Sequence, residues 1–523
     1  MQKLPPIRHT WQLLLGMLLV FLLIVPSAQA DVLPAKITVN TSADKINNDG
    51  KCSIIEAMQT AIALRPNTDC GPEVSGPVLI DFSVSTIYST DQFPNLVDDS
   101  NVTLMGPVVI VAGPTITFDL DGGTLNLINV TVKDGTTIAM DVHESATANL
   151  AGVSFMNNSA LVGGAAISNR GTLRIAGGNF TGNTISGGSG GAIENSGKLQ
   201  ITGSVFNGNV SANSGGAIFI KGGEVEISDT VFNGNIANGD AGNGGGAIAI
   251  QPNGNLKPVR IIRSVFNGNL TPKSGGGAIF NNNSNTSPQA QLQIESSSFQ
   301  GNLAGVPISS PRPGGAILNW GSVAITSTVF LNNAASNNGG ALANGDAVSG
   351  TQNSPPQRFS RYSIVNSSFI ANAAAEKGGA IADYYITDGN IGRIINSTFS
   401  LNTAVGEGGA YYSQEPNYDI VRVVNTIMDG NLPSNCADGS AAALSLTSDG
   451  NNLDSANTCG FVQSGDIINK SAALDSPNFN GGPIAALISQ KPKNGSPAID
   501  AGNNTVCSSA LVDNKDQRGE PRP

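Results

Sequence analysis

A two-part repeat runs through the middle of this chain and constrains its fold more than any other feature. Each copy begins with F-x-x-N and, about ten residues later, reaches G-G-A followed by an apolar residue. Nine copies carry both parts, and a tenth, degraded copy begins at Ile427. The F-x-x-N pairs are Phe155/Asn158, Phe180/Asn183, Phe206/Asn209, Phe232/Asn235, Phe266/Asn269, Phe299/Asn302, Phe330/Asn333, Phe369/Asn372 and Phe399/Asn402. The matching glycine pairs begin at Gly163, Gly190, Gly215, Gly245, Gly276, Gly314, Gly339, Gly378 and Gly408.

Short runs of alternating apolar and polar residues separate each glycine pair from the next phenylalanine, as in 198–202, 224–228 and 291–295. Alternation with a period of two indicates strands with one face buried and one exposed. Successive phenylalanines are 25 to 39 residues apart. A β-helix turn takes slightly more than about 20 residues, and loops inserted at the corners account for the remaining residues. The repeat therefore predicts an all-β fold, a single-stranded right-handed parallel β-helix.

Each part of the repeat has a physical reason. One turn cannot bury its own apolar face, so equivalent positions must stack on those of the next turn. We expect the phenylalanines to form a core column at the strand spacing of about 4.8 Å. The asparagines suit a left-handed corner, where each amide can bond to the amide one turn above. The glycine pairs permit a bend and a close approach of backbones. Stacking explains the repeat without any ligand.

The first 30 residues have the features of a secretory signal: basic Lys3 and Arg8, an apolar run at 11–25, and a small-x-small cleavage site at 28–30. The run is too short to span a bilayer comfortably, so cleavage is favoured over a membrane anchor, and no transmembrane segment is expected afterwards. Cleavage removes two positive charges and no negative one, so the net charge changes from −11 to −13. Such a chain repels phosphate backbones, which argues against a nucleic-acid partner.

The five cysteines lie in two clusters plus one further residue. Their spacing and an oxidising compartment predict the disulfides Cys52–Cys70 and Cys436–Cys459, and Cys507 is either free or paired elsewhere. No C-x-x-C motif is present, and His143 is the only histidine after cleavage. A zinc site is therefore not expected. Asp44, Asn48 and Asp49 could hold calcium or could equally form a turn that closes on Cys52, and no metal or cofactor is assigned.

Before the repeats, residues 37–40 read as a strand, and a helix opens at Cys52 with Ile54, Met58 and Ala61 on one face. A solenoid needs its first open turn covered, so we expect this helix to act as a cap. The predicted organisation is a signal peptide at 1–30, a capping segment at 31–78, β-helix repeats at 79–432, and a region at 433–523 that completes and caps the solenoid.

Three segments carry motifs of bacterial exported proteins. Residues 37–63 contain V-N-x-x-A-D, D-G-x-C-S and E-A, and this segment resembles the CSLREA domain, although Ile54 and Ile55 stand where that motif has Leu and Arg. The G-G-A-I and F-x-x-N signatures are similar to the repeats of polymorphic outer-membrane proteins. The C-terminus resembles the choice-of-anchor Q region through G-G-P at 481–483, G-S-P-A-I-D-A-G at 495–502 and D-Q-R-G at 516–519. These resemblances imply a pectin-lyase-like β-helix placed at the outer membrane, at the cell surface or outside the cell, and no particular activity.

One cluster late in the repeats suggests carbohydrate contact. Glu376 and Glu407 precede the glycine pairs of adjacent turns, so stacking predicts that they lie near each other. Exposed aromatic rings beside carboxylates can stack on sugar rings and hold their hydroxyl groups. The alternative is that the aromatics are core-edge residues and the charges are solvated. The candidate carbohydrate patch comprises Trp320, Glu376, Asp383, Tyr384, Tyr385, Glu407 and Tyr412.

The favoured function is a secreted or cell-surface structural or adhesive protein, non-enzymatic and monomeric, with glycans or surface proteins as partners. No catalytic residue is assigned, because a lone histidine such as His143 is usually structural. The alternatives are a carbohydrate-active enzyme (a polysaccharide lyase or glycoside hydrolase) and a carbohydrate-binding protein using the outer face of the β-helix. The enzyme requires Glu376, Asp383 and Glu407 to converge in a groove. The binding protein requires Trp320 and Tyr384 to be exposed on one face.

Overall fold

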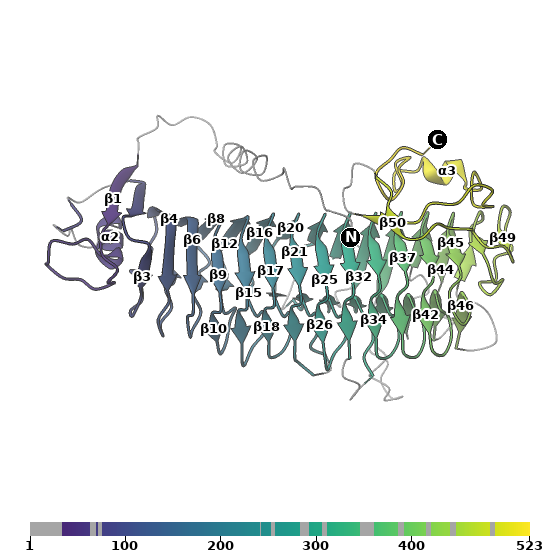
Figure 1. Cartoon of the computed structure of the whole chain (residues 1–523), viewed down its shortest axis with the longest axis horizontal. Helices are drawn as coiled ribbons and strands as arrows, with labels where there is room; N and C mark the ends of the chain where they lie inside the picture. The colour runs from purple at the N-terminus through teal and green to yellow at the C-terminus, as the bar shows by residue number, and fades with distance from the viewer. Residues whose placement is uncertain are drawn as a thin grey trace, which may run out of the picture.

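The computed structural model describes residues 34–62, 69–71, 76–240, 242–252, 257–282, 292–305, 311–345, 360–384, 392–414, 420–439, 446–481 and 487–522. They form an elongated parallel β-helix in which the strands of successive turns lie side by side (Figure 1). This confirms the predicted fold class. The predicted signal peptide at 1–30 lies outside the described residues, and no helix in the described part of the chain is long and apolar enough to cross a bilayer.

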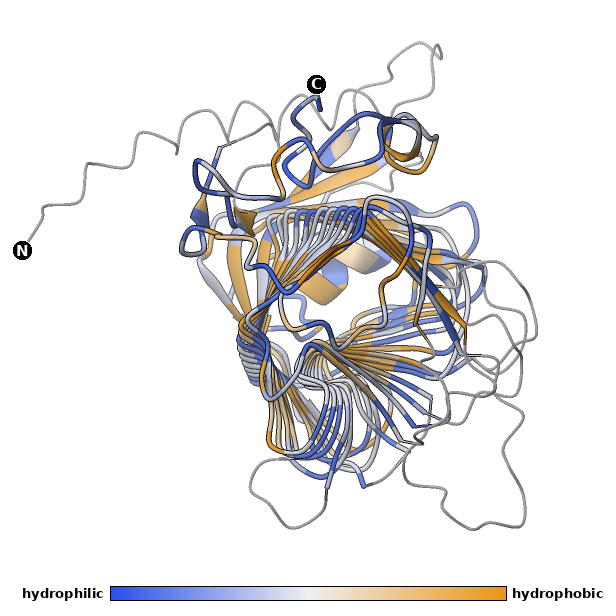
Figure 2. Cartoon of the chain, turned by 90° about the vertical axis from the view of Figure 1, so that its right-hand side faces the viewer, coloured by the Kyte–Doolittle hydropathy of each residue, from blue (hydrophilic) through white to orange (hydrophobic). Residues whose placement is uncertain are grey.

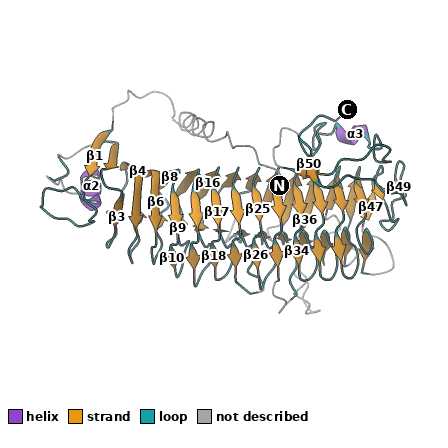
Figure 3. Cartoon of the chain, viewed as in Figure 1, coloured by secondary structure: helices purple, strands orange, loops and turns teal. Residues whose placement is uncertain are grey.

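Each full turn contributes strands to three parallel sheets of 28, 12 and nine strands. In one central turn, β16 (Lys198–Thr202) and β17 (Val205–Asn207) belong to the 28-stranded sheet, here called the large sheet. In the same turn β18 (Val210–Ser211) belongs to the nine-stranded sheet and β19 (Ile218–Ile220) to the 12-stranded sheet. Strands dominate the whole rod (Figure 3).

The 12-stranded sheet carries the residues that matter most for a functional site. Its strands are β5 (Phe118–Leu120), β7 (Met140–Val142), β11 (Ile167–Asn169), β15 (Ile193–Asn195), β19, β23 (Ile248–Ile250), β27 (Ile279–Asn281), β31 (Ile317–Asn319), β35 (Leu342–Asn344), β39 (Ile381–Asp383), β43 (Tyr411–Ser413) and β46 (Cys436–Asp438). The first residue of each strand faces the core, the second faces outward and the third again faces inward, as the pleat requires.

The phenylalanine column is present as predicted. Nine rings from Phe155 to Phe399 are fully buried, and neighbouring ring centroids lie 4.6 to 5.4 Å apart with interplanar angles of 2° to 12°. The register places each ring directly on the next, as with Phe206 on Phe232. Because each ring between the two ends of the column stacks on a ring on both sides, the column forms a continuous part of the core.

The asparagines form the predicted ladder along one corner. Asn209 Nδ2 donates to Asn235 Oδ1 at 2.9 Å and to the carbonyl oxygen of Phe180 at 2.9 Å, and the same pattern recurs along the stack. The left-handed backbone, however, belongs to the preceding residue, for example Gly208 (φ 59°) or Asn332 (φ 54°). The expectation that the ladder asparagine itself adopts the left-handed conformation is therefore wrong. The asparagine contributes the side-chain amide of the ladder, and the residue before it makes the turn.

The glycine pairs have two separate roles. The first glycine of each pair has positive φ, as at Gly276 (φ 70°), and so makes the bend. The second glycine packs against the next turn: a Cβ on Gly277 would lie 2.2 Å from the carbonyl oxygen of Gly315. Both predicted reasons for glycine, bending and close approach, are therefore confirmed.

Helix α2 (Ile54–Ala61) lies against β1 (Ala35–Val39) and β2 (Val78–Phe82) at the N-terminal end of the rod (Figure 1). Ser53 and Glu56 form a capping box at its start, which satisfies two backbone N–H groups. The disulfide Cys52–Cys70 joins the residues that flank α2 on either side. Cys436–Cys459 closes a loop near the other end of the rod, so both predicted pairs are present. Cys507 is free and buried. The role of α2 as a cap stays a prediction.

The C-terminal part of the chain lies along the flank of the rod (Figure 2). Strands β47 (Leu446–Ser448) and β48 (Leu453–Asp454) still add to the large sheet. Residues 487–522 then fold back over the outer face of that sheet, where Asn366 Nδ2 donates to the Lys515 carbonyl oxygen at 3.1 Å. This final stretch covers a side of the solenoid. The predicted domain boundaries themselves stay predictions.

Candidate functional site

The two glutamates of the predicted carbohydrate patch lie on adjacent turns, as expected. Gly406 N donates to the Glu376 carbonyl oxygen at 2.6 Å, and Gly378 N donates to the Glu407 carbonyl oxygen at 3.0 Å. Both glutamate side chains are exposed. The stacking argument therefore located these two residues correctly.

The aromatic members of the patch are buried, so the expectation of an exposed stacking surface is wrong. Trp320, Tyr384 and Tyr412 are 7%, 1% and 2% exposed. Trp320 Nε1 donates to the Gly345 carbonyl oxygen at 3.0 Å, and the Tyr384 hydroxyl donates to Asn337 Oδ1 at 3.0 Å. Tyr385 lies outside the described residues.

The physical reason is a second apolar cluster on the outside of the 12-stranded sheet. From β19 onward the outward positions of this sheet are apolar, and many of them pack together with Trp320 and Tyr384 in one buried cluster. The cluster comprises Phe219, Ala249, Phe280, Leu318, Trp320, Ala343, Ala382 and Tyr384. These rings belong to a covered core layer, which matches the core-edge alternative.

Asp383 does not join the two glutamates. It is fully buried on the inner side of β39, where Asn344 Nδ2 donates to its Oδ1 at 3.1 Å and the Tyr362 hydroxyl donates to its Oδ2 at 2.9 Å. Burial raises the pKa of Asp383 to about 6, against the opposing effect of hydrogen bonds from Tyr411, Tyr362 and Asn344. The convergence of three carboxylates that the enzyme alternative required is therefore contradicted.

Lys377 connects two members of the patch, Glu407 and Tyr412. Its Nζ lies 3.0 Å from Glu407 Oε2, donates to the Tyr412 hydroxyl at 3.0 Å, and lies 4.6 Å from the Tyr412 ring centroid. Burial acts to lower the pKa of Lys377, but the contacts with Tyr412 and Glu407 outweigh it and the pKa is raised. This local network holds the exposed edge of the turn together.

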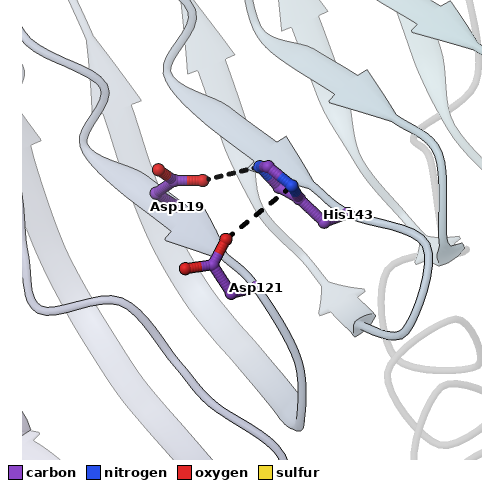
Figure 4. A group of neighbouring side chains, drawn as sticks. All are labelled: Asp119, Asp121 and His143. Carbon is purple, nitrogen blue, oxygen red and sulfur yellow. Dashed lines mark ion pairs between the residues drawn. The ribbon is translucent and has the colours of Figure 1, made fainter.

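A different cluster of charged side chains lies on the outer side of the 12-stranded sheet in the opening turns. The sequence did not predict that these residues come together. Asp119 in β5 and Asp141 in β7 are direct partners in the parallel register. Asp121 and His143 each follow two residues later, and therefore project to the same side. Figure 4 shows Asp119 and Asp121 facing two different nitrogens of the His143 ring.

The distances define the centre of this cluster. His143 Nε2 lies 3.0 Å from Asp119 Oδ1 and 3.6 Å from Asp141 Oδ2, and His143 Nδ1 lies 3.7 Å from Asp121 Oδ1. Burial raises the pKa of Asp119; the charge of His143 opposes this, and the charges of Asp121 and Asp141 add to it. Three carboxylates thus surround one imidazole at a partly buried position.

Neighbouring polar side chains hold the outer oxygens of Asp119 and Asp121 and the oxygen of Asp141 that faces His143. Gln92 Nε2 donates to Asp119 Oδ2 at 3.2 Å, and Asn95 Nδ2 donates to Asp121 Oδ2 at 2.8 Å. Arg170 forms a 3.0 Å ion pair with Asp141 Oδ2. The sequence does contain a signal for the cluster: D-x-D at 119–121 and D-x-H at 141–143 are one turn apart. Without F-x-x-N in these turns, their register could not be read.

A cavity of about 540 Å³ with a mixed polar and apolar lining lies between the large sheet and the C-terminal segment. Its lining includes Ser367, Asn396, Gln490, Gln517 and Arg518. Ser368 donates a hydrogen bond to Gln517 across this junction. The cavity marks the seam where the C-terminal segment docks on the solenoid.

Comparison with known families finds one short match. Residues 203–221 match the model of the Chlamydia polymorphic membrane protein repeat. The matched residues contain β17, β18 and β19, with Phe206, Asn209 and the glycine pair at Gly215. No curated protein and no solved structure matches the chain.

Proposed function

We propose that this protein is exported to or beyond the cell surface and acts there as a non-enzymatic structural and adhesive rod. The secretory features of residues 1–30, two disulfides and a repeat similar to those of surface-associated polymorphic membrane proteins support this placement. The repeated residues themselves are used in the buried ring column and amide ladder. Adhesion would therefore use the unrepeated outer positions.

The observation that carries the proposal is an open polar strip on the outer face of the large sheet. One outward position per turn is half-buried or exposed and polar over eight successive turns, in continuous register. The strip comprises Thr103, Asn126, Asn149, Arg174, Gln200, Glu226, Arg260 and Gln293. At the usual strand spacing it extends roughly 34 Å, long enough to follow several units of an extended glycan or an extended protein segment.

Part of the strip is ordered by hydrogen bonds between its own side chains. Asn126 Nδ2 donates to Thr103 Oγ1 at 3.1 Å, and Asn149 Nδ2 donates to Asn126 Oδ1 at 2.9 Å. Such bonds lower the conformational entropy that a bound partner would otherwise have to remove. The amide and hydroxyl groups suit the hydroxyl groups of sugars and the backbone groups of proteins.

The later turns of the same sheet are different and are already covered. Val329 and Ile370 pack with Leu487, and Val365 and Val424 pack with Val512. The outer face thus changes from polar to apolar where the C-terminal segment lies on it. Among the described residues, the C-terminal segment does not reach the earlier turns, and this part of the face is the one proposed to meet a partner.

The experiment measures binding of the full chain to coated acidic and neutral polysaccharides and surface proteins. A face variant carries Gln200→Arg, Glu226→Arg and Arg260→Glu; these strip side chains are exposed or half-buried. The matched control replaces Val210, Ile236 and Leu270 by Arg, in the same turns but on the outer side of the nine-stranded sheet. Both variants are checked for an unchanged melting temperature.

The proposal expects binding to at least one coated ligand, lost in the face variant and retained in the control. Equal binding by the two variants would assign adhesion to another surface. Binding to none of the ligands would contradict the adhesive role.

A further inference from the structure

We infer that His143, Asp119 and Asp141 form a binding site for one first-row divalent transition cation, of the Zn²⁺ or Mn²⁺ type. The site lies on the outside of the opening turns, and this inference does not depend on the proposed adhesive role. Three observations carry it: the separation of the ligand atoms, the groups that orient them, and one buried carboxylate oxygen that lacks a hydrogen-bond donor.

The imidazole nitrogen already lies at the separations that two ligands of one ion have. His143 Nε2 is 3.0 Å from Asp119 Oδ1 and 3.6 Å from Asp141 Oδ2. An ion about 2.1 Å from two ligands at a tetrahedral angle holds them ~3.4 Å apart. An ion held by His143 Nε2 and either carboxylate therefore needs only small side-chain movements.

The surrounding groups orient these ligands. His143 Nδ1 faces Asp121 Oδ1 at 3.7 Å, an arrangement in which a carboxylate accepts the N–H of a metal-bound imidazole and leaves Nε2 free to coordinate. Gln92 holds the outer oxygen of Asp119. Asp121 is held in turn by Asn95, so it acts as a positioning residue for the imidazole.

One buried carboxylate oxygen points independently to a missing positive partner. Asp141 is 8% exposed, and its Oδ1 has no hydrogen-bond donor among the described residues. This oxygen belongs to the carboxylate whose other oxygen faces His143 Nε2. Asp119 Oδ1 is also buried, and it pairs with His143 Nε2 at 3.0 Å, the nitrogen that would bind the ion. Buried carboxylate oxygens are costly without a donor or a cation.

The ligand set selects the class of ion. Ca²⁺ and Mg²⁺ prefer six or more oxygen ligands, whereas an imidazole nitrogen with two carboxylates suits Zn²⁺ or Mn²⁺. With a neutral imidazole, three carboxylates and Arg170 leave an excess of two negative charges, which a dication neutralises. The His143 side chain is 37% exposed, so the site is open to an ion from solution and to a water in the remaining position.

The test measures Zn²⁺ binding to the purified full chain by isothermal titration calorimetry after chelator treatment and dialysis. We expect one Zn²⁺ per chain, with Ca²⁺ and Mg²⁺ failing to compete at equal concentration. Asp119→Asn, Asp141→Asn and His143→Gln should each weaken binding by about 10- to 100-fold or abolish it. Asp121→Asn should weaken it by about 10-fold, and Asn would still hold the ring with a neutral acceptor.

Two controls separate this site from other acidic groups. Asp229→Asn removes a carboxylate that pairs with Arg263 in a later turn, and Asp240→Asn removes an exposed one; neither should change Zn²⁺ affinity. Circular dichroism without metal should be the same for all variants. Co²⁺ binding gives a second readout, because its visible absorption should shift in intensity when His143 is replaced.

The competing arrangement is a simple ion pair, an imidazolium held by the carboxylates with no metal. In that case Zn²⁺ would not bind at one per chain, or it would bind equally to wild type and to the Asp141→Asn and His143→Gln variants. Either result would overturn the inference, whereas the adhesive proposal would stand or fall on its own binding test.

Discussion

The hydroxyl of Tyr362 donates a hydrogen bond of 2.9 Å to Oδ2 of Asp383 in the interior of the solenoid. Asp383 continues an inner column of amides, in which Asn319 Nδ2 donates to Asn344 Oδ1 at 2.7 Å and Asn344 Nδ2 donates to Asp383 Oδ1 at 3.1 Å. A titratable carboxyl thus occupies a position that an amide fills in the two preceding turns. Its protonation must therefore affect stability.

Replacing Asp383 by Asn should stabilise the protein at neutral pH. The pKa of this carboxyl is raised from 3.8 to about 6 in the folded state, so the folded chain binds the proton more tightly than the unfolded chain. Protonated Asp383 therefore adds roughly 3 kcal/mol to the free energy of unfolding below about pH 4, and this contribution is lost as the pH rises to about 6. The gain of D383N over wild type should therefore grow across this window and stay constant above it.

Urea unfolding at pH 4, 5, 6 and 7.5 measures this difference. Asp240→Asn is the control, because that side chain is 85% exposed. Parallel stability curves for wild type and D383N over the whole range would show that Asp383 does not titrate as the structure requires.

The ring column predicts a large effect at its centre. The Phe266 ring is fully buried, with centroids 4.8 Å from Phe232 and 4.6 Å from Phe299. Phe266→Ala should lower the free energy of unfolding by about 3–5 kcal/mol through lost burial and a cavity. Val265→Ala, on the half-buried outer side of the same strand, should cost well under about 1.5 kcal/mol. An unchanged melting temperature for F266A would refute the column.

The amide ladder predicts a similar contrast between neighbouring asparagines. Asn269 Oδ1 accepts from the backbone N and the Nδ2 of Asn235, and its own Nδ2 donates to Asn302 Oδ1 at 2.9 Å. Asn269→Ala leaves several buried groups without partners, so thermal unfolding should show a loss of about 3 kcal/mol or more. The side chain of Asn267 is exposed, and its replacement by Ala should change stability by about 0.5 kcal/mol at most. Equal effects would contradict the ladder.

Two glycines of one turn should respond differently to alanine. A Cβ on Gly277 would meet the Gly315 carbonyl oxygen at 2.2 Å and force the next turn away, at a cost of more than about 3 kcal/mol. A Cβ on Gly268 meets no atom of the described residues within 4 Å, so only its positive φ of 59° opposes alanine, at about 1–2 kcal/mol. Denaturation of G277A and G268A checks this order; the reverse order would contradict the close approach of turns.

The features that could be predicted from the sequence are those that repeat at a fixed offset. Phe266, Asn269 and Gly276 each recur one turn later, so stacking assigned their contacts without knowledge of any loop. The disulfides followed from local clustering. These predictions depend on the neighbouring turn alone, which the repeat specifies.

The rest depends on segments that do not repeat. Whether Trp320 or Tyr384 is exposed depends on what covers the 12-stranded sheet, and the connections there vary in length. Likewise, the alternating pattern indicated that Asp383 and its neighbours in the chain point to opposite faces of the strand, but it did not indicate which of the two faces is buried. The cluster around His143 lies in turns without the F-x-x-N landmark, so the one-turn offset between Asp119 and Asp141 was not visible.

Polysaccharide turnover tests the central claim, a rod that binds without cleaving, most directly. The full chain is incubated with acidic and neutral polysaccharides, including any that it binds, and new chain ends are counted over time. The account predicts no release of ends above the protein-free blank, whether or not the polysaccharide is bound. Sustained release of ends that Glu407→Gln abolishes would contradict it and make this protein a polysaccharide-cleaving enzyme.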